Sequence, residues 1–246
     1  MTGLLGSELL KLRTTRTFWA MAGSTSALIL LIVILSLILD DALARPGGDE
    51  VRSLLGTGAL AGLLMLILGA VVGAGEYRHG TIASMLLVTP NRLRAVTAQV
   101  LACAVGGFVV GLVAALLVAA VSVPWLSARD ISLPDFDVVL RVVAGTSLYA
   151  GLAAALGVAL GAALRNQVAT IVTLLVLFFV LDPVISALAE DYARFSLTGL
   201  GVAIGGGTGD ELGSDILPMG VAALVWAGYT AVLTGVAALL TSRRDI

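Results

Sequence analysis

The chain has 246 residues, of which 59% are hydrophobic and 12% are charged, and its formal net charge is −2. A soluble domain carries about 25% charged residues, so this chain has too little polar surface for a water-soluble globule. It has no basic cluster long enough to bind nucleic acid, and its single cysteine, Cys103, excludes an intrachain disulfide. The composition predicts an integral membrane protein with one membrane domain and little soluble material.

Residues 1–17 are predicted to form a short amphipathic helix that lies in the inner membrane interface. Leu5, Leu9 and Leu12 recur at helical spacing, which favours one apolar face. The charged residues of this segment are Glu8, Lys11, Arg13 and Arg16, and its three cations fall largely on other faces. The alternative is an unstructured basic tail, which the regular leucine spacing disfavours.

Six apolar stretches are long enough to be transmembrane helices, which need about 20 mainly apolar residues. They are predicted at residues 18–39, 53–75, 98–122, 142–164, 168–188 and 217–241. Asp182-Pro183 interrupts the fifth near one end. Residues 195–209 are uncharged but short and rich in glycine, which is typical of a re-entrant or interfacial piece. The predicted fold is therefore all-α, with six transmembrane helices after the N-terminal interfacial helix.

Six crossings place both termini on one side of the membrane, and the basic residues indicate which side. Nine basic residues lie on the side of the termini and five on the other. The nine are Lys11, Arg13, Arg16, Arg78, Arg92, Arg94, Arg165, Arg243 and Arg244. Because cytoplasmic segments carry an excess of lysine and arginine, both termini and residues 76–97 are predicted to be cytoplasmic.

Small residues recur at a spacing that lets helix backbones approach closely. The pairs are Gly58 and Gly62, Gly69 and Gly73, Gly107 and Gly111, and Gly157 and Gly161. Such pairs favour a tightly packed helical bundle. They carry no information about the substrate or the reaction.

The six predicted spans contain few residues that could take part in catalysis or ion binding. The central parts of all six are nearly free of charge, and Asp182 lies near the outer end of the fifth. We expect Asp182 to be a solvated helix end beside a proline rather than part of a proton relay, because no acid or histidine lies at similar depth. One histidine and one cysteine do not supply a metal site, and His79 belongs to no nucleophile motif. We therefore expect no catalytic residues and no metal.

The segment 73–94, "GAGEYRHGTIASMLLVTPNRLR", lies between two apolar stretches and holds the only histidine, an adjacent Glu-Tyr-Arg, a proline and two closely spaced arginines. The series Glu76-Tyr77-Arg78-His79-Gly80-Thr81, followed by Leu86-Leu87, Pro90 and Arg92, resembles the permease subunits of ABC-2 type ABC transporters. The opening "SELLKLRTTRTFW" also resembles their N-terminal segments, and the layout matches over essentially the whole chain. The chain departs from the pattern at Gln99, where many relatives have lysine.

The resemblance implies that a separate subunit hydrolyses ATP. A P-loop needs the pattern Gly-x4-Gly-Lys-Ser/Thr, and the only lysine here is Lys11, in "SELLKLR", with no glycine in that pattern before it. We therefore expect no cofactor in this chain, and ATP with magnesium on the partner ATPase. The expected assembly holds two copies of an ABC ATP-binding subunit and a second permease, either another copy or a similar chain.

In the family, a short helix after span two docks in a groove of the ATPase and transmits its closure. By this resemblance, residues 76–97 would be the corresponding coupling segment here. Gly80 would separate it from span two, Thr81 would cap it, and Pro90 would end it. The residues assigned to ATPase coupling are Glu76, Tyr77, Arg78, His79, Gly80, Thr81, Met85, Leu86, Pro90, Arg92 and Arg94. Glu76 and Arg78 are also placed to pair with the N-terminal basic helix, whereas the alternative is a basic loop that only sets topology.

The sequence thus predicts a permease subunit of an ATP-driven exporter of drugs, lipids or other amphiphiles, in a bacterial plasma membrane. A membrane-embedded enzyme acting on lipids is one alternative, and 76–94 would be its only candidate site. A non-transporting subunit that anchors or senses is another. An apolar pathway without charged selectors fits an amphiphilic cargo, but the sequence does not identify the substrate.

Overall fold

The computed structural model describes residues 2–39, 54, 56–78, 92–129, 135–207 and 216–243. No strand occurs among these residues, and six of their helical segments are long and apolar enough to cross a membrane. These segments are Arg16–Leu39, Thr57–Arg78, Leu93–Ser127, Phe136–Leu164, Gln167–Leu188 and Met219–Leu240. The predicted all-α fold with six candidate spans is therefore confirmed.

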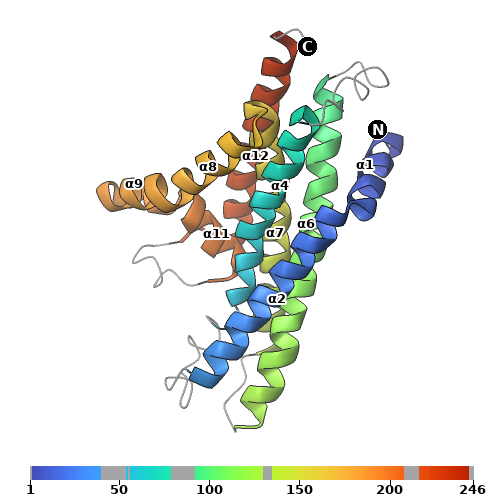
Figure 1. The fold of residues 1–246 in the computed structure, drawn as a ribbon. Coiled ribbons are helices and arrows are strands. Elements are labelled where there is room, and N and C mark those ends of the chain that lie inside the picture. The colour runs from blue at the N-terminus through green and yellow to red at the C-terminus, as the bar shows by residue number, and fades with distance from the viewer. Residues whose placement is uncertain are drawn as a thin grey trace.

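The N-terminal helix α1 (Thr2–Thr14) precedes the first span, α2 (Arg16–Leu39). The second span comprises a short 3-10 turn, η2 (Thr57–Ala59), and α4 (Leu60–Arg78), and the third span lies within α6 (Arg92–Ser127). The fourth and last spans are α7 (Phe136–Leu164) and α12 (Met219–Arg243). Helix α1 and the C-terminal end of α12 lie at the same end of the bundle (Figure 1). That this end is cytoplasmic stays a prediction.

Helix α6 extends well beyond the predicted third span. We predicted a span at 98–122, but the helix runs from Arg92 to Ser127 over 36 residues, which is about 54 Å at 1.5 Å per residue. A hydrocarbon core is only about 30 Å thick. Residues 92–97, which we assigned to the cytoplasmic coupling segment, are thus the first turns of α6. Backbone hydrogen bonding continues a helix past the end of its apolar stretch, so hydropathy marks the membrane and not the helix boundary.

Helix α7 is the centre of the bundle and packs closely against α4. A Cβ added to Gly69 would lie 2.1 Å from the carbonyl oxygen of Ala154, and one on Gly73 would lie 2.4 Å from that of Val158. On the facing helix, a Cβ on Gly157 would lie 2.1 Å from the Leu66 oxygen. The paired glycines therefore bring two helix backbones into direct contact, as the sequence predicted.

A second group of buried residues joins α7 to α12. Trp226 is fully buried and its Nε1 donates a hydrogen bond to the carbonyl oxygen of Leu152, 3.1 Å away. Its ring meets that of Tyr149 edge to face, with centroids 5.3 Å apart. This geometry is favourable for aromatic pairs, and the hydrogen bond satisfies the buried indole N–H. The last span is thus fixed to the central helix in the middle of the bundle.

The fifth span is a continuous helix made of three parts. Helix α8 (Gln167–Val176) leads into a π-helical segment, η3 (Leu177–Leu181), and then α9 (Asp182–Leu188). These parts extend away from the rest of the bundle in Figure 1, and most of their side chains are exposed. Two shorter helices follow, α10 (Glu190–Ala193) and α11 (Leu197–Gly205). Helix α11 packs against α7 and α12 and, at nine residues, is too short to cross a membrane.

Asp182 is not the solvated helix end that the sequence suggested, because it is only 3% exposed. Its carboxylate accepts hydrogen bonds from the backbone N–H groups of Leu197 (3.0 Å) and Thr198 (2.9 Å) and from the Tyr192 hydroxyl (3.2 Å). Ser196 caps the next amide, that of Gly199. The start of α11 therefore has acceptors for its first amides and a negative charge at the positive end of its dipole.

Tyr192 is the donor in one of these hydrogen bonds. Partial burial, and then the nearby charge of Asp182, raise the pKa of the Tyr192 phenol above its usual range. The hydroxyl consequently keeps its proton throughout the physiological pH range. It remains a hydrogen-bond donor to Asp182 under those conditions.

Candidate functional site

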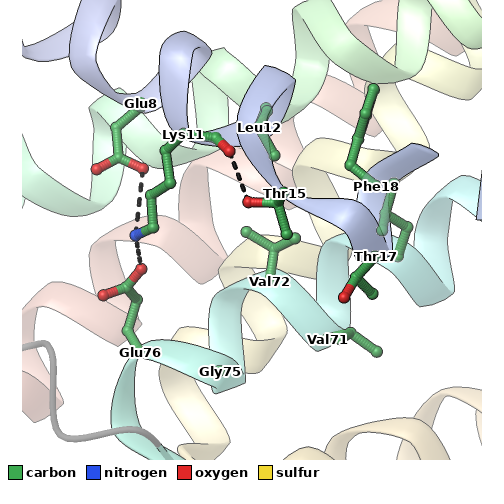
Figure 2. A pocket seen from close by; sticks show the side chains of 11 residues that line it. Glu8, Lys11, Leu12, Thr15, Thr17, Phe18, Val71, Val72, Gly75 and Glu76 are labelled. Atoms are coloured by element: carbon green, nitrogen blue, oxygen red, sulfur yellow. Dashed lines mark hydrogen bonds and ion pairs between the residues drawn. The ribbon is translucent and has the colours of Figure 1, made fainter. Parts of the chain in front are cut away.

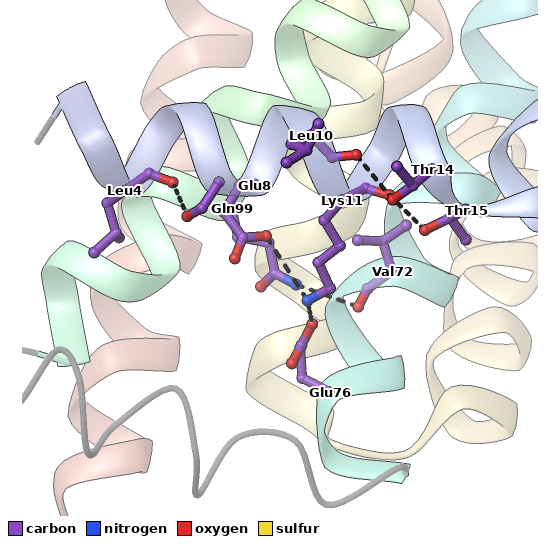
Figure 3. Close-up of polar contacts among 10 residues, drawn as sticks. Leu4, Glu8, Leu10, Lys11, Thr14, Thr15, Val72, Glu76 and Gln99 are labelled. Atoms are coloured by element: carbon purple, nitrogen blue, oxygen red, sulfur yellow. Dashed lines mark hydrogen bonds and ion pairs between the residues drawn. The ribbon is translucent and has the colours of Figure 1, made fainter.

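Charged and polar side chains gather where α1, α4 and α6 meet. Helix α1 contributes Glu8 and Lys11, the last turns of α4 contribute Glu76, and α6 contributes Gln99. We call these four residues the polar junction. Figure 3 shows the side chains directed toward one another from the three helices. The junction lies at the end of the bundle that holds α1 and the C-terminal end of α12 (Figure 1).

Lys11 links α1 to α4 through an ion pair. Its Nζ donates a hydrogen bond to the Oε1 of Glu76 and lies 3.9 Å from the Oε2 of Glu8. The Glu76 side chain is 6% exposed, whereas that of Lys11 is 45% exposed. A buried carboxylate is thus held by a half-exposed ammonium, the only one that a lysine supplies in this chain. The predicted pairing of Glu76 with the N-terminal helix is confirmed.

Gln99 is buried and makes a neutral contact with α4. Its Nε2 donates to the carbonyl oxygen of Val72, 3.3 Å away. Val72 precedes Glu76 by one helical turn, so Gln99 contacts the same stretch of α4 as Lys11. We noted Gln99 in the sequence only as a departure from the family pattern. A lone amide among apolar residues near the start of a span is a signal that would have placed it in the junction.

The final residues of α4 contact the fourth and fifth spans. The predicted pairing of Arg78 with the N-terminal helix does not occur with any described residue of that helix; the Nη1 of Arg78 donates to the Oε1 of Gln167, 2.9 Å away at the start of α8. The guanidinium carbon of Arg165 lies 5.1 Å from the ring centroid of Tyr77, within reach of a cation–π contact. Arg165 ends α7 in the left-handed conformation, with a φ of 56°. The end of α4 is thus connected to α1 by Glu76 and to α7 and α8 by its last two residues.

The apolar face of α1 contains a charge that helical spacing alone did not reveal. Leu12 is buried and Leu5 and Leu9 pack partly against the core, as their spacing predicted. Glu8 lies on the same face and is 8% exposed. Arg13 and Arg16 are exposed. The helix packs this face mainly on α6, so protein covers Leu12 and, in part, Leu5 and Leu9, whereas Leu10 on another face is exposed.

The remaining predicted coupling residues lie at or beyond the limits of the described structure. Arg94 is exposed in the first turn of α6, and Arg92 is the first residue of that helix. The others lie outside the described residues, namely His79, Gly80, Thr81, Met85, Leu86 and Pro90. The expected helix break at Gly80, cap at Thr81 and stop at Pro90 therefore stay predictions.

No group of three potential metal ligands occurs in the part of the chain that the structure describes. No protein-family model matches the chain, and no curated protein sequence is significantly similar to it. The functional assignment consequently depends on the polar junction, the helical architecture and the residues of segment 73–94.

We expect removal of Lys11 to destabilise the protein more than neutralisation of Glu76. Lys11→Met leaves a buried carboxylate without its ammonium, which costs about 3–5 kcal/mol in a fully buried pair and roughly half as much here, where the lysine is half exposed. Glu76→Gln keeps an acceptor for Lys11, which water also reaches, so a loss below about 1 kcal/mol is expected. Thermal unfolding in detergent measures both.

The double variant Lys11→Met/Glu76→Gln provides the control for this comparison. Because it leaves Glu8 as the one buried carboxylate of the polar junction, whereas Lys11→Met leaves both Glu8 and Glu76, it should be less destabilised than Lys11→Met alone. Equal losses of stability in Lys11→Met and Glu76→Gln would contradict the expected difference between them.

Proposed function

We propose that this chain is the membrane-spanning permease subunit of an ATP-driven exporter of the ABC-2 type. It would sit in the bacterial plasma membrane with two copies of a separate ATP-binding subunit and a second permease. Drugs, lipids or other amphiphiles are the proposed cargo. The six candidate spans support a multi-pass membrane protein. The family, the partners and the cargo are proposed.

The ion pair between Lys11 and Glu76 is the observation that carries the proposal. It connects the N-terminal helix to the last turns of span two, immediately before the polar series of 79–94. A segment that receives motion from an ATPase must be mechanically tied to the spans that it moves. Here the end of α4 is tied to α1 through Glu76, and the backbone of α4 is packed directly on α7 through glycines. Displacement of the α4 end would therefore be passed to α1 and α7.

The ATPase partner provides the first test. The chain is co-expressed with a candidate P-loop ATPase from its own organism, and the complex is purified through a tag on the ATPase. We expect Arg78→Glu/Arg92→Glu to weaken co-purification at least tenfold, because like charges placed opposite each other across an interface cost several kcal/mol. ATP-dependent uptake of a fluorescent amphiphile into inverted membrane vesicles should fall in parallel.

The matched control is Arg129→Glu/Arg141→Glu, which reverses two arginines predicted to lie on the other side of the membrane. It should leave co-purification unchanged. The coupling assignment is wrong if Arg78→Glu/Arg92→Glu preserves both association and ATP-dependent uptake. Loss of a lipid-modifying activity in His79→Ala, with no ATPase captured, would favour the enzyme instead. An intact complex that moves no amphiphile would favour a sensor or anchor.

A further inference from the structure

A cavity of about 290 Å³ lies between the corner formed by α1 and α2 and the facing side of α4. Figure 2 shows Glu8, Lys11 and Glu76 at one end of this cavity. The rest of the wall is mainly apolar and includes Leu12, Phe18, Leu68, Val71 and Val72. The cavity thus has a charged end and a hydrocarbon-like wall, which is the polarity of an amphiphile.

Glu8 defines the kind of head group that this charged end accepts. Its side chain is 10% exposed, and its carboxylate receives no hydrogen bond from the described residues. Lys11 approaches it only to 3.9 Å, because the lysine donates its hydrogen bond to Glu76. The Glu8 carboxylate lines the cavity without a hydrogen-bond donor from the described residues, and the donor that a carboxylate binds most strongly is a cation. The site is therefore complementary to an ammonium group.

The volume of the cavity limits the size of the ligand. Sites for drug-sized molecules occupy about 300–1,000 Å³, so this cavity is at the lower end of that range. It accommodates a small head group and the beginning of a chain, while the rest of the chain must continue outside. An inorganic cation would leave the apolar wall without a contact. A primary amine attached to a hydrocarbon chain fits both the charge and the shape.

We propose that this cavity binds the ammonium group of a long-chain amine or an amine-headed lipid. The ammonium donates to the Glu8 carboxylate, and the chain lies along Phe18, Val71 and Val72. Bound there, the ligand occupies the space next to the Lys11–Glu76 ion pair. This inference concerns a binding site of this chain alone and does not depend on the ATPase partner.

Photo-crosslinking of the full-length protein in phosphatidylglycerol nanodiscs tests the proposal. The probe is dodecylamine with a diazirine in its chain, and dodecanol with the same diazirine is the uncharged comparison. Mass spectrometry should locate the amine label on residues 12–18 and 68–75, with about tenfold less label from the alcohol, as expected for a hydrogen bond to a buried charge. Labelling of the exposed helix α8 serves as the reference for non-specific contact.

Two variants test the charge of Glu8 and the space of the cavity separately. Glu8→Gln removes the charge and should lower amine labelling about tenfold relative to α8. Gly75→Leu keeps every charge but fills the cavity, because a Cβ at Gly75 has no atom within 4 Å. It should block labelling without harming the fold, since leucine favours a helix more than glycine does. Gly228→Leu, at an equally open position on α12, is the matched control and should label normally.

The source of the amine is distinguished by competition. Phosphatidylethanolamine added to the nanodiscs should reduce amine labelling if the natural ligand is a lipid head group. Competition by unlabelled dodecylamine alone would indicate a free long-chain amine. Equal labelling by the amine and the alcohol, or unchanged labelling in both Glu8→Gln and Gly75→Leu, would overturn the proposal. Neither readout requires the ATPase, so failure of the exporter proposal would leave this test interpretable.

Discussion

Replacing Gly157 by leucine should lower the stability of the protein by about 3 kcal/mol or more. A Cβ at this position would lie 2.1 Å from the carbonyl oxygen of Leu66 and 2.8 Å from the amide nitrogen of Ala70, both in the backbone of α4. Overpacking usually costs 1–3 kcal/mol, and the upper end applies here because a helix backbone cannot rotate away as a side chain does. Thermal unfolding in detergent should show a midpoint lower by about 10 °C.

Gly228→Leu is the control for this substitution, because it makes the same chemical change in the middle of α12. A Cβ at Gly228 meets no atom within 4 Å, so its unfolding midpoint should stay within about 2 °C of the wild type. If Gly157→Leu has the same unfolding midpoint as the wild type, α4 and α7 do not pack through their glycines.

Because α4 and α7 are in close contact, a displacement at the polar junction, at one end of the bundle, is passed to the central helix. Protein interiors are close-packed and transmit strain, so two helices in backbone contact move largely as one unit. Glu76 lies at the end of α4 and holds Lys11 of α1. A displacement of α1 is therefore resisted by both α4 and α7, whereas α8 and α9 project away from the bundle and are largely exposed.

Hydropathy predicted the six candidate spans because the physical requirement for a membrane helix is a local one. A run of about 20 apolar residues satisfies it without reference to any other segment. The glycine spacing was equally informative, since close packing of helices needs small residues at regular intervals. Helix ends were less predictable. Helix α6 includes Arg92 and Arg94, ahead of its apolar stretch, because arginine favours helical structure about as well as leucine does.

Buried charges were the features that the sequence predicted least well. Glu8 lies in the N-terminal helix and Asp182 lies near one end of the fifth span, and both are positions where a charge is ordinarily assumed to face water. Asp182 is buried by partners 10 to 16 residues further along the chain, and Glu8 lines a cavity between helices, and local periodicity reveals neither arrangement. The sequence predicted that Glu76 pairs with the N-terminal basic helix, but it did not single out Lys11 among the three cations of that segment.

The expected consequence of removing the Asp182 carboxylate is a loss of about 2–4 kcal/mol. Asp182→Ala leaves the amides of Leu197 and Thr198 without their acceptors, and each partly buried donor so exposed costs about 1–3 kcal/mol. Thermal unfolding measures the total. Amide hydrogen exchange should show where stability is lost, with faster exchange at the start of α11 and little change in the amides of α4.

Asp182→Asn distinguishes this structural role from proton transfer. Asparagine keeps one acceptor oxygen for the α11 amides but has no titrating proton, so its stability should lie between those of the wild type and Asp182→Ala. Asp137→Ala removes an acid whose side chain is 73% exposed and should change the midpoint very little. A variant Asp182→Asn that remains fully stable yet loses transport would indicate that the proton, rather than the cap, is what the protein uses.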